Sequence, residues 1–167
     1  SLYGLQRDGL LADALKILCT GRSALSQEAF AEQVRAALAQ RVAREEQDPA
    51  QIEALLARLR YRAAALDDPA QLKGLTDEIA ALRQGDVLYH LSTAPRFYAP
   101  ICAALGAAGL AGPGTRVMIE KPIGHDLKSA VAINDGVGAV FEETRIFRTD
   151  HYLGKEGVQN LLALRFG

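Results

Sequence analysis

The stretch DVLYHLSTAPRFYAPICAALGAAGLAGPGTRVMIEKP, residues 86–122, decides the fold that we predict for this chain. It contains an apolar strand at 86–93, a largely helical segment that begins near Ala94, and a second apolar strand at 116–122. A strand, a helix and a strand in this order join two parallel strands of one sheet. The stretch therefore predicts a parallel sheet that helices cover on both faces.

The same alternation continues upstream. ALKILCT (14–20) predicts a buried strand that ends in the turn GRS, and Ser26 is placed to cap a helix that runs to about Arg44. The tetrapeptide DPAQ occurs at Asp48 and at Asp68, each time with Asp as the N-cap and Pro at the first helical position. The flanking residues of the two copies differ, so we interpret them as independent helix starts, not as an internal repeat.

Downstream, Asp126 predicts the cap of a further helix, RIFRTD (145–150) predicts a strand, and KEGVQNLLALRF begins the last helix. The fold class that follows is α/β, a doubly wound and mostly parallel sheet of the Rossmann type. The opening residues SLYGLQRDGLL show a helical period without a cap or a preceding strand. We therefore expect an incomplete sheet that lacks its first strand and its glycine-rich turn.

One glycine-rich segment, GAAGLAGPG (106–114), invites comparison with a dinucleotide fingerprint. A true fingerprint follows a strand and opens a helix, because its amides and the helix end hold pyrophosphate. Here the glycines close a helix and precede a strand. The context predicts a helix C-terminus and a loop.

The bulk composition excludes several classes of protein. With 167 residues, 49% hydrophobic and 23% charged, the chain is typical of a globular domain with a real core. A formal net charge of -1 provides no general attraction to nucleic acid or to an anionic membrane, and no apolar run is long enough to span a bilayer. The start lacks the features of a signal peptide, so we expect a cytoplasmic protein.

Cys19 and Cys102 fall in apolar runs without a second ligand nearby, which predicts buried free thiols.

Unusual side chains follow several of the predicted strands, where ligands bind in doubly wound sheets. Arg22 follows the first strand-like run, at a place where an acidic residue usually holds a ribose hydroxyl, and it suits a 2′-phosphate instead. Lys121 ends another strand within EKP, and Pro122 restricts its backbone. A solvated surface residue is the plain alternative for both cations.

The loop DHYLGKE (150–156) gathers donors suited to a phosphate dianion. Lys155 supplies a positive charge, Tyr152 an O–H and His151 an N–H, and the helix that follows adds free backbone N–H groups. Asp150 would be repelled by the phosphate, so we expect its carboxylate to orient a general base. The alternative is a capped helix with a hydrogen-bonded His–Asp pair. His90 and His125 predict structural roles, and the three histidines show no zinc spacing, so we expect no metal site.

These motifs together resemble one known family, the glucose-6-phosphate dehydrogenases. RIFRTDHYLGKEGVQNLLALRF is similar to the active-site signature of that family, and RVMIEKPIGHDL is similar to its second conserved block. YHLSTAPRFYAPI and ILCTGRS match the family pattern in the same order, so the resemblance covers nearly the whole chain. Ala94–Pro95 departs from the two prolines of many members.

The resemblance implies an activity and a set of site residues. The family oxidises glucose 6-phosphate to 6-phosphogluconolactone, the first step of the pentose phosphate pathway, and passes the hydride to NADP. Lys121 would contact substrate and cofactor next to a cis-proline, while Arg22 and Tyr98 would contact the cofactor. The remaining carried-over residues are the substrate-binding His151, Tyr152 and Lys155, and Asp150, which would pair with a catalytic histidine that has no counterpart here.

The resemblance also implies that this chain is a partial one. We expect residues 1–149 to form a partial NADP-binding domain and 150–167 to begin the substrate-binding region, with little turnover from the chain alone. Homo-oligomers would form through a domain not present here. Two alternatives stay open: a sugar dehydrogenase of the EKP type with a non-phosphorylated substrate, and a non-catalytic remnant that retains a phosphate pocket.

Overall fold

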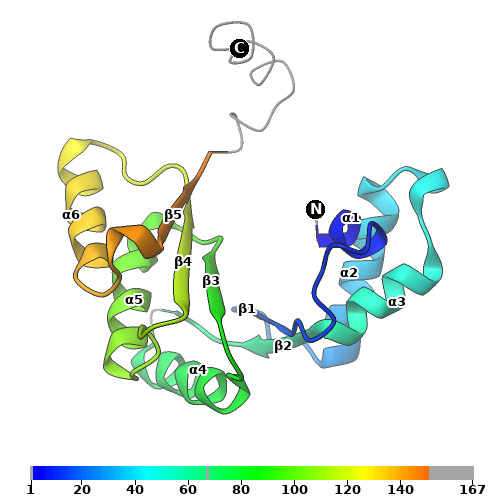
Figure 1. The fold of residues 1–167 in the computed structure, drawn as a ribbon, viewed down its shortest axis with the longest axis horizontal. Helices are drawn as coiled ribbons and strands as arrows, with labels where there is room; N and C mark the ends of the chain where they lie inside the picture. The colour runs from blue at the N-terminus through cyan, green and yellow to red at the C-terminus, as the bar shows by residue number, and fades with distance from the viewer. Residues whose placement is uncertain (1, 67, 151–167) are drawn as a thin grey trace, which may run out of the picture. The chain divides into compact units, whose positions relative to one another are not determined.

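The computed structural model describes residues 2–66 and 68–150. The chain divides into two compact units, Ser1–Gln71 and Leu72–Gly167. Figure 1 labels the helices and strands of both units in chain order. Each unit contains its own sheet, and all strand pairs in both sheets are parallel, which confirms the predicted α/β class.

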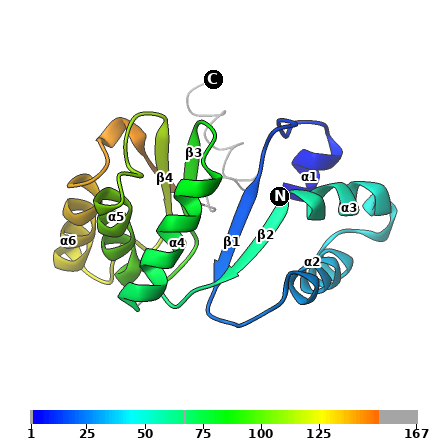
Figure 2. The ribbon, with the colours of Figure 1, turned by 90° about the horizontal axis from the view of Figure 1, so that it is seen from below.

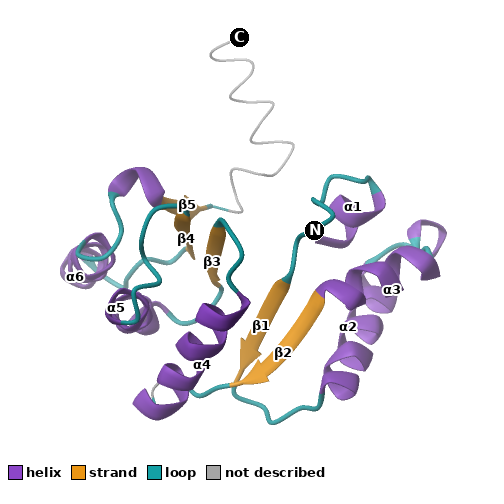
Figure 3. Cartoon of the chain, turned by 60° about the horizontal axis from the view of Figure 1, so that its bottom comes forward, coloured by secondary structure: helices purple, strands orange, loops and turns teal. Residues whose placement is uncertain are grey.

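The first unit contains a two-stranded sheet. β1 (Ile17–Gly21) pairs with β2 (Leu59–Ala63), and the register sets Cys19 opposite Tyr61. Figure 3 shows the two strands side by side, with α2 near β2. The helices of this unit are α1 (Leu2–Arg7), α2 (Gln27–Arg41) and α3 (Pro49–Arg58), with a short 3-10 turn at Arg44–Glu46.

Local capping explains where these helices begin. Ser26 Oγ accepts a hydrogen bond from Ala29 N at 3.1 Å and starts α2. Asp48 Oδ1 accepts from Ala50 N at 2.8 Å and starts α3, with Pro49 at the first helical position. Asp68 Oδ1 accepts from Ala70 N at 2.9 Å in the same way. The predicted caps of all three helices are confirmed.

The second unit contains a three-stranded sheet in the order β3–β4–β5. Its strands are β3 (Val87–Leu91), β4 (Thr115–Glu120) and β5 (Ile146–Thr149). Its helices are α4 (Pro69–Leu82), whose first turn spans the boundary between the units, α5 (Tyr98–Ala107) and α6 (Leu127–Gly138), with 3-10 turns at Pro95–Phe97 and Glu143–Arg145. α5 and α6 lie side by side next to this sheet (Figures 1 and 2).

The core of the second unit lies on one face of its sheet. Val117 and Ile119 of β4 are completely buried, as are Cys102 of α5 and Val137 of α6. On the opposite face Leu88 and Phe147 are 52% and 45% exposed. Within the described residues, the expected helical cover therefore reaches one face of this sheet and leaves the other open.

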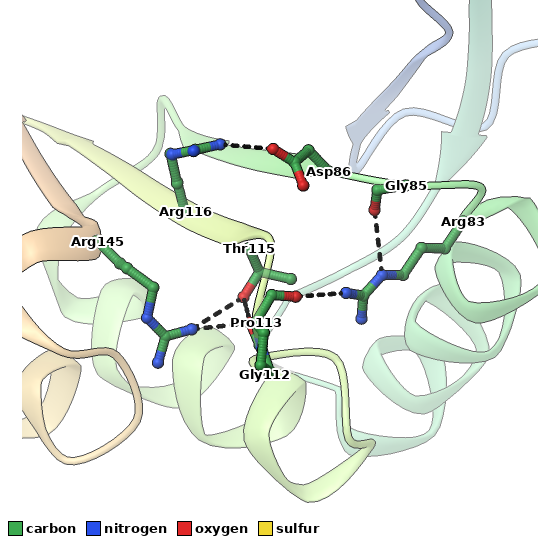
Figure 4. Close-up of polar contacts among 8 residues, drawn as sticks. All are labelled: Arg83, Gly85, Asp86, Gly112, Pro113, Thr115, Arg116 and Arg145. Atoms are coloured by element: carbon green, nitrogen blue, oxygen red, sulfur yellow. Dashed lines mark hydrogen bonds and ion pairs between the residues drawn. The ribbon is translucent and has the colours of Figure 1, made fainter.

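The glycine-rich segment is a helix end and a loop, as predicted. Gly109 has a φ of 70°, and Leu110 N donates to Leu105 O at 2.8 Å, which ends α5. Arg145 Nη1 donates to Gly112 O at 2.8 Å, and Arg83 Nη2 donates to Pro113 O at 3.0 Å. Figure 4 shows these guanidinium groups around the loop that leads into β4. The loop carbonyls at the amino end of β4 are thus held by cationic side chains.

Candidate functional site

The candidate site of the second unit lies at the carboxyl ends of β4 and β5. The parallel register aligns Glu120 with Thr149, so Lys121 and Asp150 follow side by side. Lys121 Nζ lies 2.6 Å from Asp150 Oδ2, and Lys121 N donates to Thr149 O at 3.4 Å. Two of the residues that we singled out from the sequence are therefore in direct contact.

This ion pair leaves the lysine accessible. The Lys121 side chain is 60% exposed, whereas the Asp150 side chain is 22% exposed. The ammonium has two further donor positions beyond the one that faces Asp150. An anionic ligand could bind Lys121 while the carboxylate still orients it.

Glu120, the residue before Lys121, is fixed by three side chains. His90 Nε2 lies 2.8 Å from Glu120 Oε1, and Ser92 Oγ donates to Glu120 Oε2 at 3.5 Å. The Tyr98 hydroxyl donates to Glu120 O at 3.0 Å. Because these contacts hold both the carboxylate and the backbone of Glu120, they define where the Lys121 side chain begins.

Tyr98 and His90 both contact Glu120. Tyr98 is 1% exposed, and its described contact is with the backbone of Glu120; that it lines the cofactor site stays a prediction. His90 was expected to be a satisfied core or flank histidine; its side chain is 49% exposed and pairs with Glu120. The sequence signal for this pair was His90 near the end of one predicted strand and Glu120 at the end of the next. It predicts a contact only once the register of the two strands is known.

The loop after Lys121 is tightly built. The Lys121–Pro122 peptide bond is cis. A Cβ at Gly124 would lie 2.6 Å from Ala130 N, so only glycine allows the loop to approach α6 this closely. Asp126 caps α6 by accepting from Ser129 N at 2.7 Å. The hydrogen bond from the Ser129 hydroxyl, and after it this backbone bond, lowers the pKa of Asp126. His125 lies in the turn before this helix, as predicted.

Arg22 lies in the first unit, directly after β1. Its side chain is exposed, and the neighbouring residues T-G-R-S include no acidic group. Gly21 O accepts from Ala64 N at 2.8 Å, which ties the end of β1 to the end of β2. The site of Arg22 therefore has a fixed backbone and an exposed cation suited to an anion.

Several predicted features fall outside or beside these sites. His151, Tyr152 and Lys155 lie outside the described residues, and so does the start of the last predicted helix.

Within residues 2–66 and 68–150, no cluster of three or more His, Cys, Asp or Glu side chains could hold a metal ion. Cys19 and Cys102 are free thiols; Cys102 is buried, as predicted, whereas Cys19 is only partly buried. Burial raises the pKa of both thiols, that of Cys102 to about 12. In the part of the chain that the structure describes, no helix combines the length and apolar character needed to cross a bilayer.

Comparisons with known proteins point in one direction. A family model described as "Glucose-6-phosphate dehydrogenase, NAD binding domain" matches residues 1–160. A glucose-6-phosphate 1-dehydrogenase of Zymomonas mobilis is 46% identical over 167 residues, which is 100% of this chain and 34% of that protein. One of Mycolicibacterium smegmatis is 43% identical over 171 residues, with 100% and 34% covered. The chain thus spans about a third of the length of these curated relatives.

Solved structures agree with the sequence relatives. A crystal structure of glucose-6-phosphate 1-dehydrogenase from Mycobacterium avium matches with a TM-score of 0.84 at 35% identity, over 99% of this chain and 35% of that chain. A glucose-6-phosphate dehydrogenase in complex with its substrate glucose-6-phosphate matches with a TM-score of 0.82 at 34% identity, again over 99% and 35%. The similarity extends over nearly all of the present chain and over one part of each relative.

Proposed function

This chain belongs to the glucose-6-phosphate dehydrogenase family, and on that premise we propose that it forms part of an NADP-dependent glucose-6-phosphate 1-dehydrogenase. The reaction oxidises glucose 6-phosphate at C1 to 6-phosphogluconolactone, the first step of the pentose phosphate pathway. The bound cofactor supplies the hydride acceptor, and the protein positions the reacting groups. We expect little turnover from the isolated chain, because its sequence contains neither a glycine-rich cofactor turn after a strand nor the family's catalytic histidine.

The contact between Lys121 and Asp150 is the observation that carries this proposal. Asp150, whose carboxylate pairs with Lys121, is followed directly by His151, the first of the three proposed phosphate donors. Tyr152 and Lys155 follow within the same motif, DHYLGKE. In this proposal Lys121 donates hydrogen bonds to substrate and cofactor, and the three donors after Asp150 bind the phosphate. Asp150 orients the imidazole of a general base that this chain does not contain, and holds Lys121 when no substrate is bound.

The family model supports a nicotinamide dinucleotide cofactor, and we propose specifically NADP. The described residues fit a 2′-phosphate at Arg22, where an exposed guanidinium follows β1 without an acidic neighbour. A carboxylate at this turn would favour an unmodified ribose instead. Tyr98 and Lys121 are the other proposed cofactor residues, and Tyr98 lines the cofactor site in this proposal.

Substitution of Lys155 tests the phosphate part of the proposal. In a protein that carries this chain between flanking segments of the length found in its relatives, Lys155→Ala should raise the KM for glucose 6-phosphate by about tenfold or more. The reason is the loss of a charge-assisted contact with a dianion. Steady-state kinetics measure this, and Lys73→Ala is the control, since Lys73 is an exposed lysine paired with Asp77 within α4.

The two alternatives give different results in the same assay. A sugar dehydrogenase with a non-phosphorylated substrate predicts that Lys155→Ala behaves like Lys73→Ala. A non-catalytic remnant predicts no turnover even with both flanking segments present. Either result would contradict the proposed activity.

The remaining expectations concern the whole protein. We propose a cytoplasmic enzyme that forms homo-oligomers through residues outside this chain. Light scattering on the extended protein would test the assembly, with a monomer at micromolar concentration as the contrary result.

A further inference from the structure

Tyr61 of β2 extends to the turn that carries Arg22. Its hydroxyl donates to Ser23 O at 2.7 Å. A Cβ placed on Gly21 would lie 3.1 Å from the same hydroxyl, so the phenol also lies against Gly21. Tyr61 thus contacts the residues on both sides of Arg22.

The Tyr61 ring is itself held firmly. It stacks on Phe30 of α2, with ring centroids 4.7 Å apart and an interplanar angle of 21°. Gln27, the first residue of α2, donates to Leu59 O at 2.9 Å and accepts from Tyr61 N at 2.9 Å. The side chain of Gln27 therefore pairs with the backbone of β2 much as a neighbouring strand would. The turn from β1 to α2, whose course can be followed in Figure 3, is held at both of its ends by these contacts and by the Tyr61 hydroxyl.

The carbonyl groups beside Arg22 also accept backbone hydrogen bonds. Leu25 N donates to Ser23 O at 3.0 Å, and Ala64 N donates to Gly21 O at 2.8 Å. The Tyr61 hydroxyl shares its acceptor with the first of these bonds, and the phenol lies against Gly21, whose carbonyl accepts the second. Loss of the hydroxyl should therefore loosen the turn while the stacked ring stays in place.

We propose that Tyr61 is a positioning residue that sets the direction of Arg22 and thereby favours 2′-phosphorylated adenosine over its unphosphorylated form. The inference rests on the proposed role of Arg22. A flexible side chain that begins from a fixed backbone loses less freedom when it binds an anion. Tyr61 does not touch the ligand; it raises the affinity for the 2′-phosphate through the turn.

The test compares Tyr61→Phe with the unmodified chain in two independent measurements. NMR titrations give the affinities for adenosine 2′,5′-bisphosphate and for adenosine 5′-monophosphate. We expect Tyr61→Phe to weaken bisphosphate binding by about three- to tenfold, the effect of one hydrogen bond, and to leave monophosphate binding unchanged. Hydrogen exchange at the Leu25 and Ala64 amides should become faster by a similar factor.

Tyr89→Phe provides a matched control. The Tyr89 hydroxyl also donates to a backbone carbonyl, Leu110 O at 2.9 Å, but it belongs to the other unit. This variant should leave the affinity ratio of the two nucleotides and the Leu25 exchange rate unchanged. A purely structural role for Tyr61 would weaken both nucleotides equally.

Each contrary outcome has its own meaning. Unchanged exchange at Leu25 and Ala64 in Tyr61→Phe overturns the claim that Tyr61 holds the turn. Faster exchange with an unchanged affinity ratio overturns its role in recognition. If Arg22→Ala binds the bisphosphate as tightly as the unmodified chain does, the proposed 2′-phosphate site itself is wrong. Because that result is measured on the Arg22 variant, it is distinguishable from a failure of the Tyr61 inference.

Discussion

Lys121 is the residue whose surroundings most constrain the proposed chemistry. Its ammonium faces Asp150, while His90, Ser92 and Tyr98 fix the preceding Glu120. The site therefore combines an exposed cation with a backbone that contacts from neighbouring elements hold still. Positioned donors of this kind need little rearrangement when a ligand arrives.

Cys102 gives a prediction on pH dependence. Burial raises the pKa of its thiol from an ordinary 9.0 to about 12. The unfolded chain then loses this proton at a lower pH than the folded chain, so the contribution of Cys102 to stability is complete below pH 9 and is lost as pH rises toward 12. Over that interval the unfolding free energy should fall by at most about 1.4 kcal/mol per pH unit because of this thiol.

Urea unfolding at several pH values measures this decline. Cys102→Ala should show a shallower decline than the unmodified chain, because the other titrating groups are shared by both proteins. Cys19→Ala is the comparison: burial also raises the pKa of this partly buried thiol, but less than that of Cys102, so Cys19→Ala should make the decline shallower by a smaller amount than Cys102→Ala. Equal declines for Cys102→Ala and the unmodified chain would show that the thiol does not have the raised pKa.

The sequence predicted the key residues of this site better than their partners. EKP marked Lys121 at a strand end, and the loop after β5 marked Asp150, because such positions follow from the alternation of elements. The ion pair between them depends on the register of β4 and β5, in which Glu120 lies opposite Thr149. The sequence does not specify that register, so the ion pair of Asp150 with Lys121 and the contact of His90 with Glu120 could not be predicted. The assignment of Asp150 to the imidazole of a general base stays a prediction.

At the scale of elements, capping residues predicted helix starts well. Ser26, Asp48, Asp68 and Asp126 each accept a hydrogen bond from the first turn of the helix that they were expected to cap. The first strand was predicted at 14–20, whereas β1 covers Ile17–Gly21. Apolar character alone placed it too early, because Leu15 N donates to Ala12 O in a turn.

Two glycines of α6 provide a matched pair of substitutions. A Cβ on Gly136 would lie 2.5 Å from Ala99 Cβ in α5, whereas a Cβ on Gly138 would meet nothing within 4 Å. Gly136→Ala should therefore destabilise the protein by about 1–3 kcal/mol through overpacking of the two helices. Gly138→Ala should stabilise it by up to about 1 kcal/mol, because alanine favours the helix.

Thermal or denaturant unfolding of both variants tests how α5 and α6 pack. The comparison is internal, because both substitutions add the same methyl group to the same helix. Equal stabilities of the two variants would show that Gly136 does not mediate a close contact with α5.

At the scale of the molecule, parallel pairing was predictable and the grouping of the strands was not. Strands separated by helices pair in parallel for geometric reasons, which the sequence pattern reveals. Which strands pair with which depends on tertiary contacts, and the described strands form a sheet of two and a sheet of three. The open face that bears Leu88 and Phe147 could not be anticipated either, because their apolar character predicts burial.

The central claim is that Lys121 forms part of a site for a phosphorylated sugar beside a nicotinamide cofactor. The most direct measurement is NADP+ reduction by the extended protein, with glucose 6-phosphate and with glucose, in the unmodified form and as Lys121→Met, with Lys73→Met as the control. We predict turnover that strongly prefers glucose 6-phosphate, and a loss on the order of a hundredfold in kcat/KM for Lys121→Met, the effect of removing one positioned donor. Equal use of the two sugars, or unimpaired kcat/KM in Lys121→Met, would contradict the account.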